Sequence, residues 1–160
     1  MTLSVVCLAI TIHAQDTSQL FEKLANLEDQ YGNHLDYSMD AIVTFIFVEG
    51  NNNTFMDIYS KFKGKNLKPN AFVISGWKNV MPGVNSKSKR EHMFMAMKAD
   101  QGLGKDGYPI FLDMDSNTHQ ILNLKQYSVI KFNPKAHKLS IKSYGSDRAG
   151  FIRAIRQYFI

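Results

Sequence analysis

The uninterrupted apolar run at residues 41–48, AIVTFIFV, constrains the fold of this chain more than any other feature of its sequence. Most of its residues are β-branched or aromatic and they do not alternate with polar ones, which is typical of a strand buried on both faces. Two shorter runs, AFVIS at residues 71–75 and YPIFLDM at residues 108–114, have the same character. Because such strands need helices on both faces of their sheet, the sequence predicts an α/β domain.

In the stretches around these runs, apolar residues recur at the intervals typical of helices. In residues 16–31, leucines and a tyrosine recur at intervals of four, three and four, which predicts a helix ahead of the first strand. Similar patterns predict four later helices and a closing hairpin, with the helices at 55–62, 88–97, 121–124 and 151–159 and the hairpin strands at 129–132 and 139–144. The alternating order of strands and helices predicts a largely parallel central sheet, which the hairpin makes mixed.

The bulk composition fits one globular domain but does not choose a partner. Of the 160 residues, 44% are hydrophobic and 21% are charged, close to the globular average. The net charge of +5 permits a nucleic acid, an anionic membrane or an acidic protein as partner. Basic residues cluster loosely at 61–68 and 87–90, and Phe62 is the only aromatic residue among them. Since single-strand binding interleaves charges with exposed aromatics, nucleic acid is not the favoured partner.

The first residues indicate export. Residues 3–12, LSVVCLAITI, form an uncharged apolar run that ends near the small residue Ala14, which is the shape of a secretory signal even though no Lys or Arg precedes it. We therefore predict a signal peptide at 1–14, an N-terminal helix and connection at 15–39, and a domain at 40–160, in a periplasmic or secreted protein. The run is too short to span a membrane, so no anchor is expected after its removal. A buried N-terminal strand is the alternative.

Few residues suit catalysis or metal binding. Cys7 is the only cysteine and lies in the predicted leader, so the mature chain is expected to contain neither a disulfide nor a thiol nucleophile. The five histidines share no ligand-like spacing, and we expect no metal and no cofactor. No phosphate-binding glycine motif or nucleophile elbow occurs in the chain. We therefore expect a protein that is not an enzyme.

The stretch at residues 108–160 resembles the second half of a thioredoxin, and the run at 41–48 resembles the central strand that leads into the thioredoxin active site. The resemblance implies a thioredoxin-like mixed central sheet with flanking helices and a helical insertion. Both redox signatures are absent: residues 50–54 read GNNNT where Cys-x-x-Cys would begin, and Ser128 occupies the place of the cis-proline. A cis bond before a residue other than proline costs about 3–4 kcal/mol, so we expect the Tyr127–Ser128 peptide to be trans.

Some positions are similar to the assembly proteins of type-F conjugative pili, which are periplasmic parts of a type IV secretion apparatus. The sequence FVISG at residues 72–76 resembles their glycine-ending strand, residues 86–98 resemble their helical insertion, and residues 114–116 resemble their Asp turn. The family's Ser-Met-Pro after the central strand is missing, and Ser128 replaces its strand-entry proline. The resemblance implies partners among envelope or secretion-system proteins.

The candidate binding residues follow the predicted strands. We select them for their polar or aromatic character at strand ends: Asn51, Asn52, Asn53, Trp77, Lys78, Asp115 and Ser128. Trp77 suits a binding hot spot, although it could equally fold back over the core. Asp113 and Asp115 could together hold a divalent cation, but we favour Asp115 as a helix cap and Asp113 as exposed. As the alternative function, a small ligand or substrate would bind where these loops and Glu49 meet.

Overall fold

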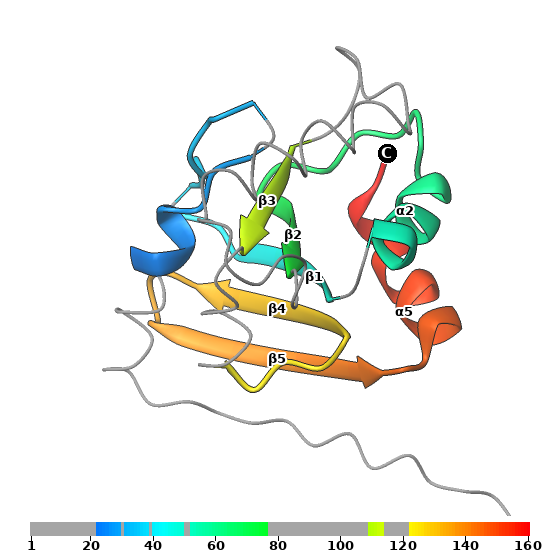
Figure 1. The fold of residues 1–160 in the computed structure, drawn as a ribbon. Helices are drawn as coiled ribbons and strands as arrows, with labels where there is room; N and C mark the ends of the chain where they lie inside the picture. The colour runs from blue at the N-terminus through cyan, green and yellow to red at the C-terminus, as the bar shows by residue number, and fades with distance from the viewer. Residues whose placement is uncertain (1–21, 30, 39, 50–51, 77–108, 114–121) are drawn as a thin grey trace, which may run out of the picture.

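The computed structural model describes residues 22–29, 31–38, 40–49, 52–76, 109–113 and 122–160 (Figure 1). Over these residues the chain forms a five-stranded sheet with helices beside it. In chain order the elements are β1 (Val43–Glu49), α2 (Asn52–Ser60), β2 (Ala71–Gly76), β3 (Ile110–Asp113), β4 (Tyr127–Asn133), β5 (Lys138–Gly145), α5 (Arg148–Ile155) and the 3₁₀ turn η1 (Arg156–Tyr158). Each predicted strand is present, with its ends within two residues of the expected positions.

The strand order across the sheet is β3-β2-β1-β4-β5 (Figure 1). β1 pairs in parallel with β2, and β2 pairs in parallel with β3. β4 runs antiparallel to both β1 and β5. The sheet is therefore mixed, with a parallel half of three strands and an antiparallel half of two, as the sequence predicts.

The two faces of the sheet bury separate apolar cores. On one face, β-strand residues such as Val48 and Val129 pack with Phe151 and Ile155 of α5 and with Ile58 of α2. On the other face, the three phenylalanines Phe45, Phe47 and Phe111 pack with Leu24, Leu35, Leu122 and Leu124 from segments outside the sheet. In Figure 1, α2 and α5 lie together on one side of the sheet, and the short helix at residues 22–25 lies on the opposite side.

α5 begins with a side-chain cap at Asp147. The Asp147 carboxylate accepts a hydrogen bond from the Gly150 N–H at 2.9 Å, so it satisfies one of the donors that a helix start leaves unpaired. Phe151, one turn into the helix, is completely buried and stacks on Tyr127 of β4 with ring centroids 5.1 Å apart. The cap and this ring contact together fix α5 against the antiparallel half of the sheet.

The prediction of a continuous helix over residues 16–31 is wrong at its C-terminal end. Residues 22–25 are helical, but Glu28 and Asp29 form isolated β-bridges with His34 and Phe111. The cause is local: the buried Asp29 carboxylate accepts hydrogen bonds from the backbone N–H groups of Tyr31 and Asn33, both at 2.8 Å. Such side-chain bonds compete with the helical ladder and stabilise a turn instead.

No helix among the described residues is both long enough and apolar enough to cross a bilayer. The predicted leader at residues 1–14 and the predicted helical insertion at 86–98 lie outside the described residues.

Candidate functional site

The carboxyl ends of β1, β2 and β3 meet at one edge of the sheet, which is where ligands bind in many open α/β sheets. Of the predicted binding residues, Asn51, Trp77, Lys78 and Asp115 lie outside the described residues. The backbone of Asn52 and Asn53 forms the first turn of α2, immediately after the carboxyl end of β1. The structure thus brings the start of α2 to this edge of the sheet, while a role for Asn52 and Asn53 in binding stays a prediction.

Ser128 lies in β4, opposite Phe47 of β1. Its side chain is completely buried, and its hydroxyl is within 3.1 Å of the Lys125 carbonyl oxygen and 3.2 Å of the Ser143 hydroxyl. The Tyr127–Ser128 peptide is trans, as expected, and none of the described peptide bonds is cis. The hydroxyl therefore joins β4 to β5 inside the fold, while a role for Ser128 in binding stays a prediction.

Asp113 departs from the sequence expectation. We expected an exposed side chain, whereas only 2% of the residue is accessible. The reason is that β3 continues through Asp113, which pairs with Gly76 of β2 and shares a face with the buried Phe111. The second carboxylate of the predicted cation pair, Asp115, lies outside the described residues, and within them no group of three or more potential metal-binding side chains occurs.

The Phe47 ring of β1 leaves no room for a side chain at Gly76 in β2. A Cβ atom at this position would clash with Cζ of Phe47 and would lie 2.8 Å from Cε2 of the same ring. The Phe47 ring therefore lies against the backbone of Gly76, at the carboxyl end of β2. Because β1 and β2 are central strands, this contact closes the core directly below the edge where the candidate loops begin.

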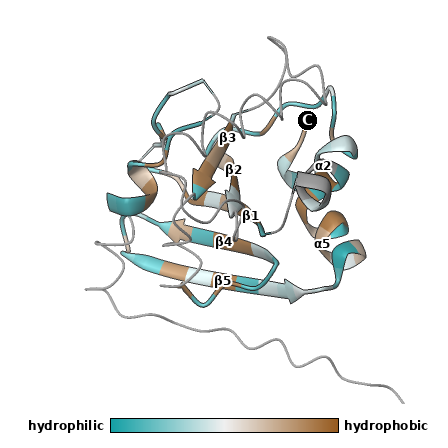
Figure 2. Ribbon diagram, viewed as in Figure 1, coloured by the Kyte–Doolittle hydropathy of each residue, from teal (hydrophilic) through white to brown (hydrophobic). Residues whose placement is uncertain are grey.

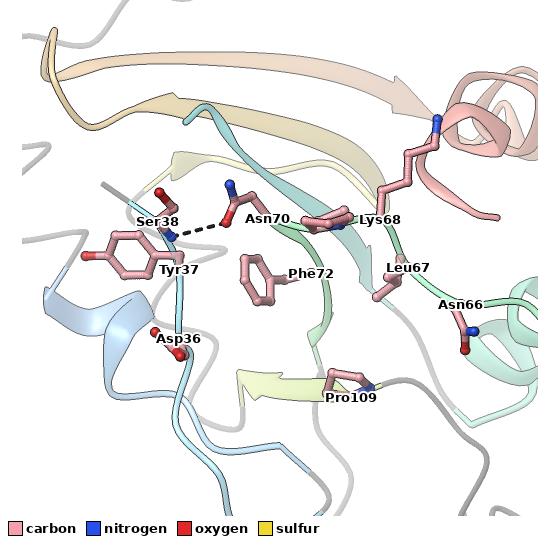
Figure 3. Close-up of a pocket in the computed structure, with 11 residues that line it drawn as sticks. Asp36, Tyr37, Ser38, Asn66, Leu67, Lys68, Asn70, Phe72 and Pro109 are labelled. Carbon is pink, nitrogen blue, oxygen red and sulfur yellow. Dashed lines mark hydrogen bonds between the residues drawn. The ribbon is translucent and has the colours of Figure 1, made fainter. Parts of the chain in front are cut away.

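A pocket of about 690 Å³ lies at the opposite edge, beside the amino ends of β2 and β3 (Figure 3). It is formed by three segments that are far apart in the sequence, namely residues 36–38, residues 66–72 and Pro109. In Figure 3 the Phe72 ring lies at the centre, with the Tyr37 ring facing it and Pro109 below. Polar groups of Asp36, Ser38 and Asn70 lie around the rim.

One hydrogen bond fixes the wall of this pocket. The Ser38 N–H donates to Oδ1 of Asn70 at 3.1 Å, which ties the 36–38 segment to the turn before β2 (Figure 3). Asn70 has a φ of 59°, a left-handed conformation that asparagine tolerates better than most residues. Burial raises the pKa of Tyr37 above its usual value of 10.0, because it disfavours the charged phenolate. The arrangement suits a small molecule with an apolar ring and a few hydrogen-bonding groups.

Sequence reasoning missed this pocket. Its residues follow no common periodicity, because they come from two connections and the start of a strand. The one available signal in the sequence is the cluster Lys68-Pro69-Asn70, which is typical of a tight turn.

No protein-family model matches the chain, and no curated protein matches it. Among solved structures, the N-terminal domain of PilB from Neisseria gonorrhoeae aligns with a TM-score of 0.50 at 13% identity, covering 84% of this chain and 91% of that one. The fold is thioredoxin-like.

A second solved structure, the exposed lipoprotein thioredoxin of Streptococcus pneumoniae strain TIGR4, aligns with a TM-score of 0.48 at 12% identity, covering 82% of this chain and 96% of that one. At such identities a structural likeness concerns the fold and not the activity. The predicted thioredoxin-like fold is confirmed, and the resemblance to pilus assembly proteins stays a prediction.

Proposed function

We propose that this chain is an exported thioredoxin-like protein that acts by binding other envelope proteins and performs no thiol–disulfide exchange. One observation carries the proposal. The segment between β1 and the first turn of α2, where a thioredoxin would place its Cys-x-x-Cys, reads Gly50-Asn51-Asn52-Asn53-Thr54. Asparagine and threonine side chains cannot exchange electrons with a disulfide, because that chemistry needs a thiolate.

The rest of the sequence offers no substitute thiol. Cys7 is the only cysteine of the 160 residues, and it precedes β1 by 36 positions. A dithiol cycle needs two sulfurs on Cα atoms about 4.4–6.8 Å apart, so this chain cannot close an intramolecular disulfide. When asparagine side chains replace the two catalytic cysteines, the fold itself is retained. The loops at the ends of its strands can then still recognise a partner.

In its finer form, the proposal places the protein in a cell-envelope machine such as the assembly system of a type-F conjugative pilus. The apolar run at residues 3–12 supports export, and the segment FVISG, which forms most of β2, supports the resemblance. Trp77 and Lys78 directly follow β2, and the amide-rich segment 51–53 follows β1, so these residues are proposed to contact the partner.

Two measurements test the proposal. The first is reduction of insulin by the purified chain and by Cys7→Ser, with a dithiol thioredoxin as positive control; neither form is expected to exceed the uncatalysed rate. The second is crosslinking and affinity capture from envelope fractions, with the intact mass of the bait measured. A bait cleaved after Ala14 that captures secretion components in the wild type, but not with Trp77→Ala, supports the proposal. An uncleaved cytoplasmic bait contradicts it.

A small-ligand binder is the second candidate, and the pocket at the amino ends of β2 and β3 is the observation that favours it. Its volume of about 690 Å³ falls within the roughly 300–1,000 Å³ of small-molecule sites. In a thermal-shift screen, a ligand of this pocket should raise the melting temperature of the wild type but not of Tyr37→Ala. A control variant at an exposed residue of the α2–β2 connection, Lys61→Ala, should respond like the wild type.

A further inference from the structure

The positive charge of the chain is concentrated in its C-terminal part. Residues 122–160 contain eight Lys and Arg and a single acidic residue, Asp147. The whole chain contains 19 Lys and Arg against 14 Asp and Glu, so the residues before 122 carry more acidic than basic groups. Residues 122–160, which include β4, β5, α5 and the turn η1, thus carry a net charge of +7, which the −2 of the preceding residues reduces to the +5 of the whole chain.

Three of these lysines lie on one face of the antiparallel pair. Lys131 of β4 is directly opposite Ser140 of β5, and Lys142 and Lys138 of β5 are the next residues along that face on either side of Ser140. All three are exposed, whereas Leu139 and Ile141 between them are buried on the opposite face. Figure 2 shows the resulting alternation of hydrophilic and hydrophobic bands along β5. We call Lys131, Lys138 and Lys142 the lysine face.

The lysine face has no counter-charge among the described residues. The ion pairs of this part of the chain use other cations: Lys135 pairs with Asp40 at 3.0 Å, and Arg148 pairs with Asp57. Two of the three lysines instead lie over aromatic rings, Lys142 at 5.3 Å from the centroid of Tyr144 and Lys131 at 5.8 Å from that of Tyr158. These contacts hold the ammonium groups near the surface without neutralising them.

We propose that the lysine face docks the protein onto the anionic headgroups of a lipid bilayer. Three exposed ammonium groups that pair with no carboxylate of the described residues lie on the antiparallel pair β4 and β5 and attract phosphate groups, and each Lys near an anionic membrane adds to the attraction. The face itself offers no large exposed apolar side chain, because the only ones among the described residues are Tyr31, Ile42 and Ile160. A specific protein interface would need such buried anchors at its centre, so a headgroup layer fits the face better than a folded partner.

A nucleic acid fits the face less well. Single-strand binding relies on aromatic rings that stack on bases, and both tyrosines here are only partly exposed and already lie under lysines. The proposal is independent of any protein partner, because the proposed partner contacts lie at the carboxyl ends of the parallel strands and not on β4 or β5. Combined with the proposed function, it means that the exported protein binds its partner while β4 and β5 face the membrane.

Vesicle cosedimentation of the full chain tests the proposal. The vesicles contain phosphatidylcholine alone or phosphatidylcholine mixed with phosphatidylglycerol, which separates electrostatic binding from any binding by the apolar residues 3–12. We expect tighter binding to the anionic vesicles, and we expect added salt to weaken it by screening. The triple variant Lys131→Gln/Lys138→Gln/Lys142→Gln should lose about two orders of magnitude in affinity for anionic vesicles, at about fivefold per lysine.

The matched control removes the same charge elsewhere. Lys61, Lys63 and Lys65 are exposed in the connection between α2 and β2, and their triple change to Gln should retain most of the binding. Unchanged melting temperatures would establish that both triple variants fold. Equal binding to the two vesicle types, or equal losses in the two triple variants, would overturn the proposal. So would a chain that binds a single-stranded oligonucleotide through the lysine face and binds no vesicle.

Discussion

The parallel and antiparallel halves of the sheet differ in how far their strands are buried. In the parallel half, every residue of β2 and β3 and all but the last residue of β1 are buried. In the antiparallel half, β5 alternates between buried and exposed residues through its middle. Figure 2 shows the contrast, since β3 is almost uniformly hydrophobic and β5 is banded.

This difference in burial separates the residues that stabilise the fold from those that are available for binding. A strand covered on both faces adds apolar area to two cores at once, so its side chains contribute mainly to the free energy of folding. A strand with one wet face can carry charge at little cost, and β5 has two of the three lysines of the lysine face. Substitutions along the two halves should therefore separate into a stability class and a binding class.

The largest expected effect is in the parallel half. Phe47→Ala removes a completely buried ring from the centre of the sheet and should lower the free energy of unfolding by about 3–5 kcal/mol. Ile141→Val in β5 deletes one methylene from the same core and should cost only about 0.5–1.5 kcal/mol. Urea denaturation measures both, and equal losses would contradict the comparison.

The contact between Phe47 and Gly76 should be visible as a coupling. Gly76→Ala places a Cβ atom against the Phe47 ring and should cost about 1–3 kcal/mol by overpacking. In the background of Phe47→Leu, which shortens the side chain, the same change should cost much less. A double-mutant cycle measures the difference, and additive free energies would show that the ring does not restrict this position.

Ser128 joins the two strands of the antiparallel half. Ser128→Ala removes a buried hydroxyl that bonds to the Lys125 carbonyl and to the Ser143 hydroxyl, and should cost about 1–2 kcal/mol. Ser143→Ala removes the more exposed partner of the same contact and should cost less. Thermal unfolding compares the two variants. A larger loss with Ser143→Ala would contradict this prediction, because Ser128→Ala removes the hydroxyl pair and the bond to the carbonyl together.

Tyr127 should make the stability depend on alkaline pH. Burial raises the pKa of its phenol in the folded chain, the nearby Arg148 partly offsets this, and Asp57 raises the pKa further. The raised pKa means that the fold favours the neutral phenol. This stabilisation is complete below the ordinary tyrosine pKa of about 10 and is lost as the pH rises through the raised value. Tyr127→Phe should lose stability less steeply between pH 9 and pH 11 in denaturation experiments than the wild type does.

The smallest expected effect is on the wet face. Lys138→Thr replaces an exposed residue of β5 by one that is compatible with a strand, and the free energy of unfolding should change by less than about 0.5 kcal/mol. Vesicle binding should nevertheless weaken several-fold, so the same variant separates the two classes. A large loss of stability would show that Lys138 belongs to the packing of the sheet.

The sequence predicted the fold better than the site, for a physical reason. The run at residues 41–48 and the alternation at 139–144 are repeated patterns, and both correspond to strands shifted by no more than two residues. The helix expected to continue to Tyr31 failed because a single carboxylate, that of Asp29, captures the backbone donors of its own turn. Asp113 lies within the strand predicted at residues 108–114, but the uninterrupted apolar run could not show that the end of this strand is covered, so its burial was missed.

The pocket around Phe72 also could not be predicted from the sequence pattern. Phe72 belongs to a recognisable strand, but Tyr37 and Pro109 reach it only through the three-dimensional fold. Periodicity reports on residues that are close in sequence, whereas this pocket joins segments that are more than 25 residues apart. Of the predicted binding residues, Ser128 is the one whose described side chain can be assessed, and its hydroxyl bonds within the fold.

The β-bridge at Asp29 limits how many copies of the chain could associate by pairing their edge strands. Glu28 and Asp29 cover the outer side of β3, since the Leu112 N–H donates to the Glu28 carbonyl at 3.2 Å and Asp29 bridges to Phe111. Among the described residues, no strand or bridge covers the outer side of β5. Two copies paired through β5 would present a covered β3 at each end, so a third copy would find no free edge strand within the part of the chain that the structure describes. Association by strand addition would therefore end at a dimer and could not grow into a filament.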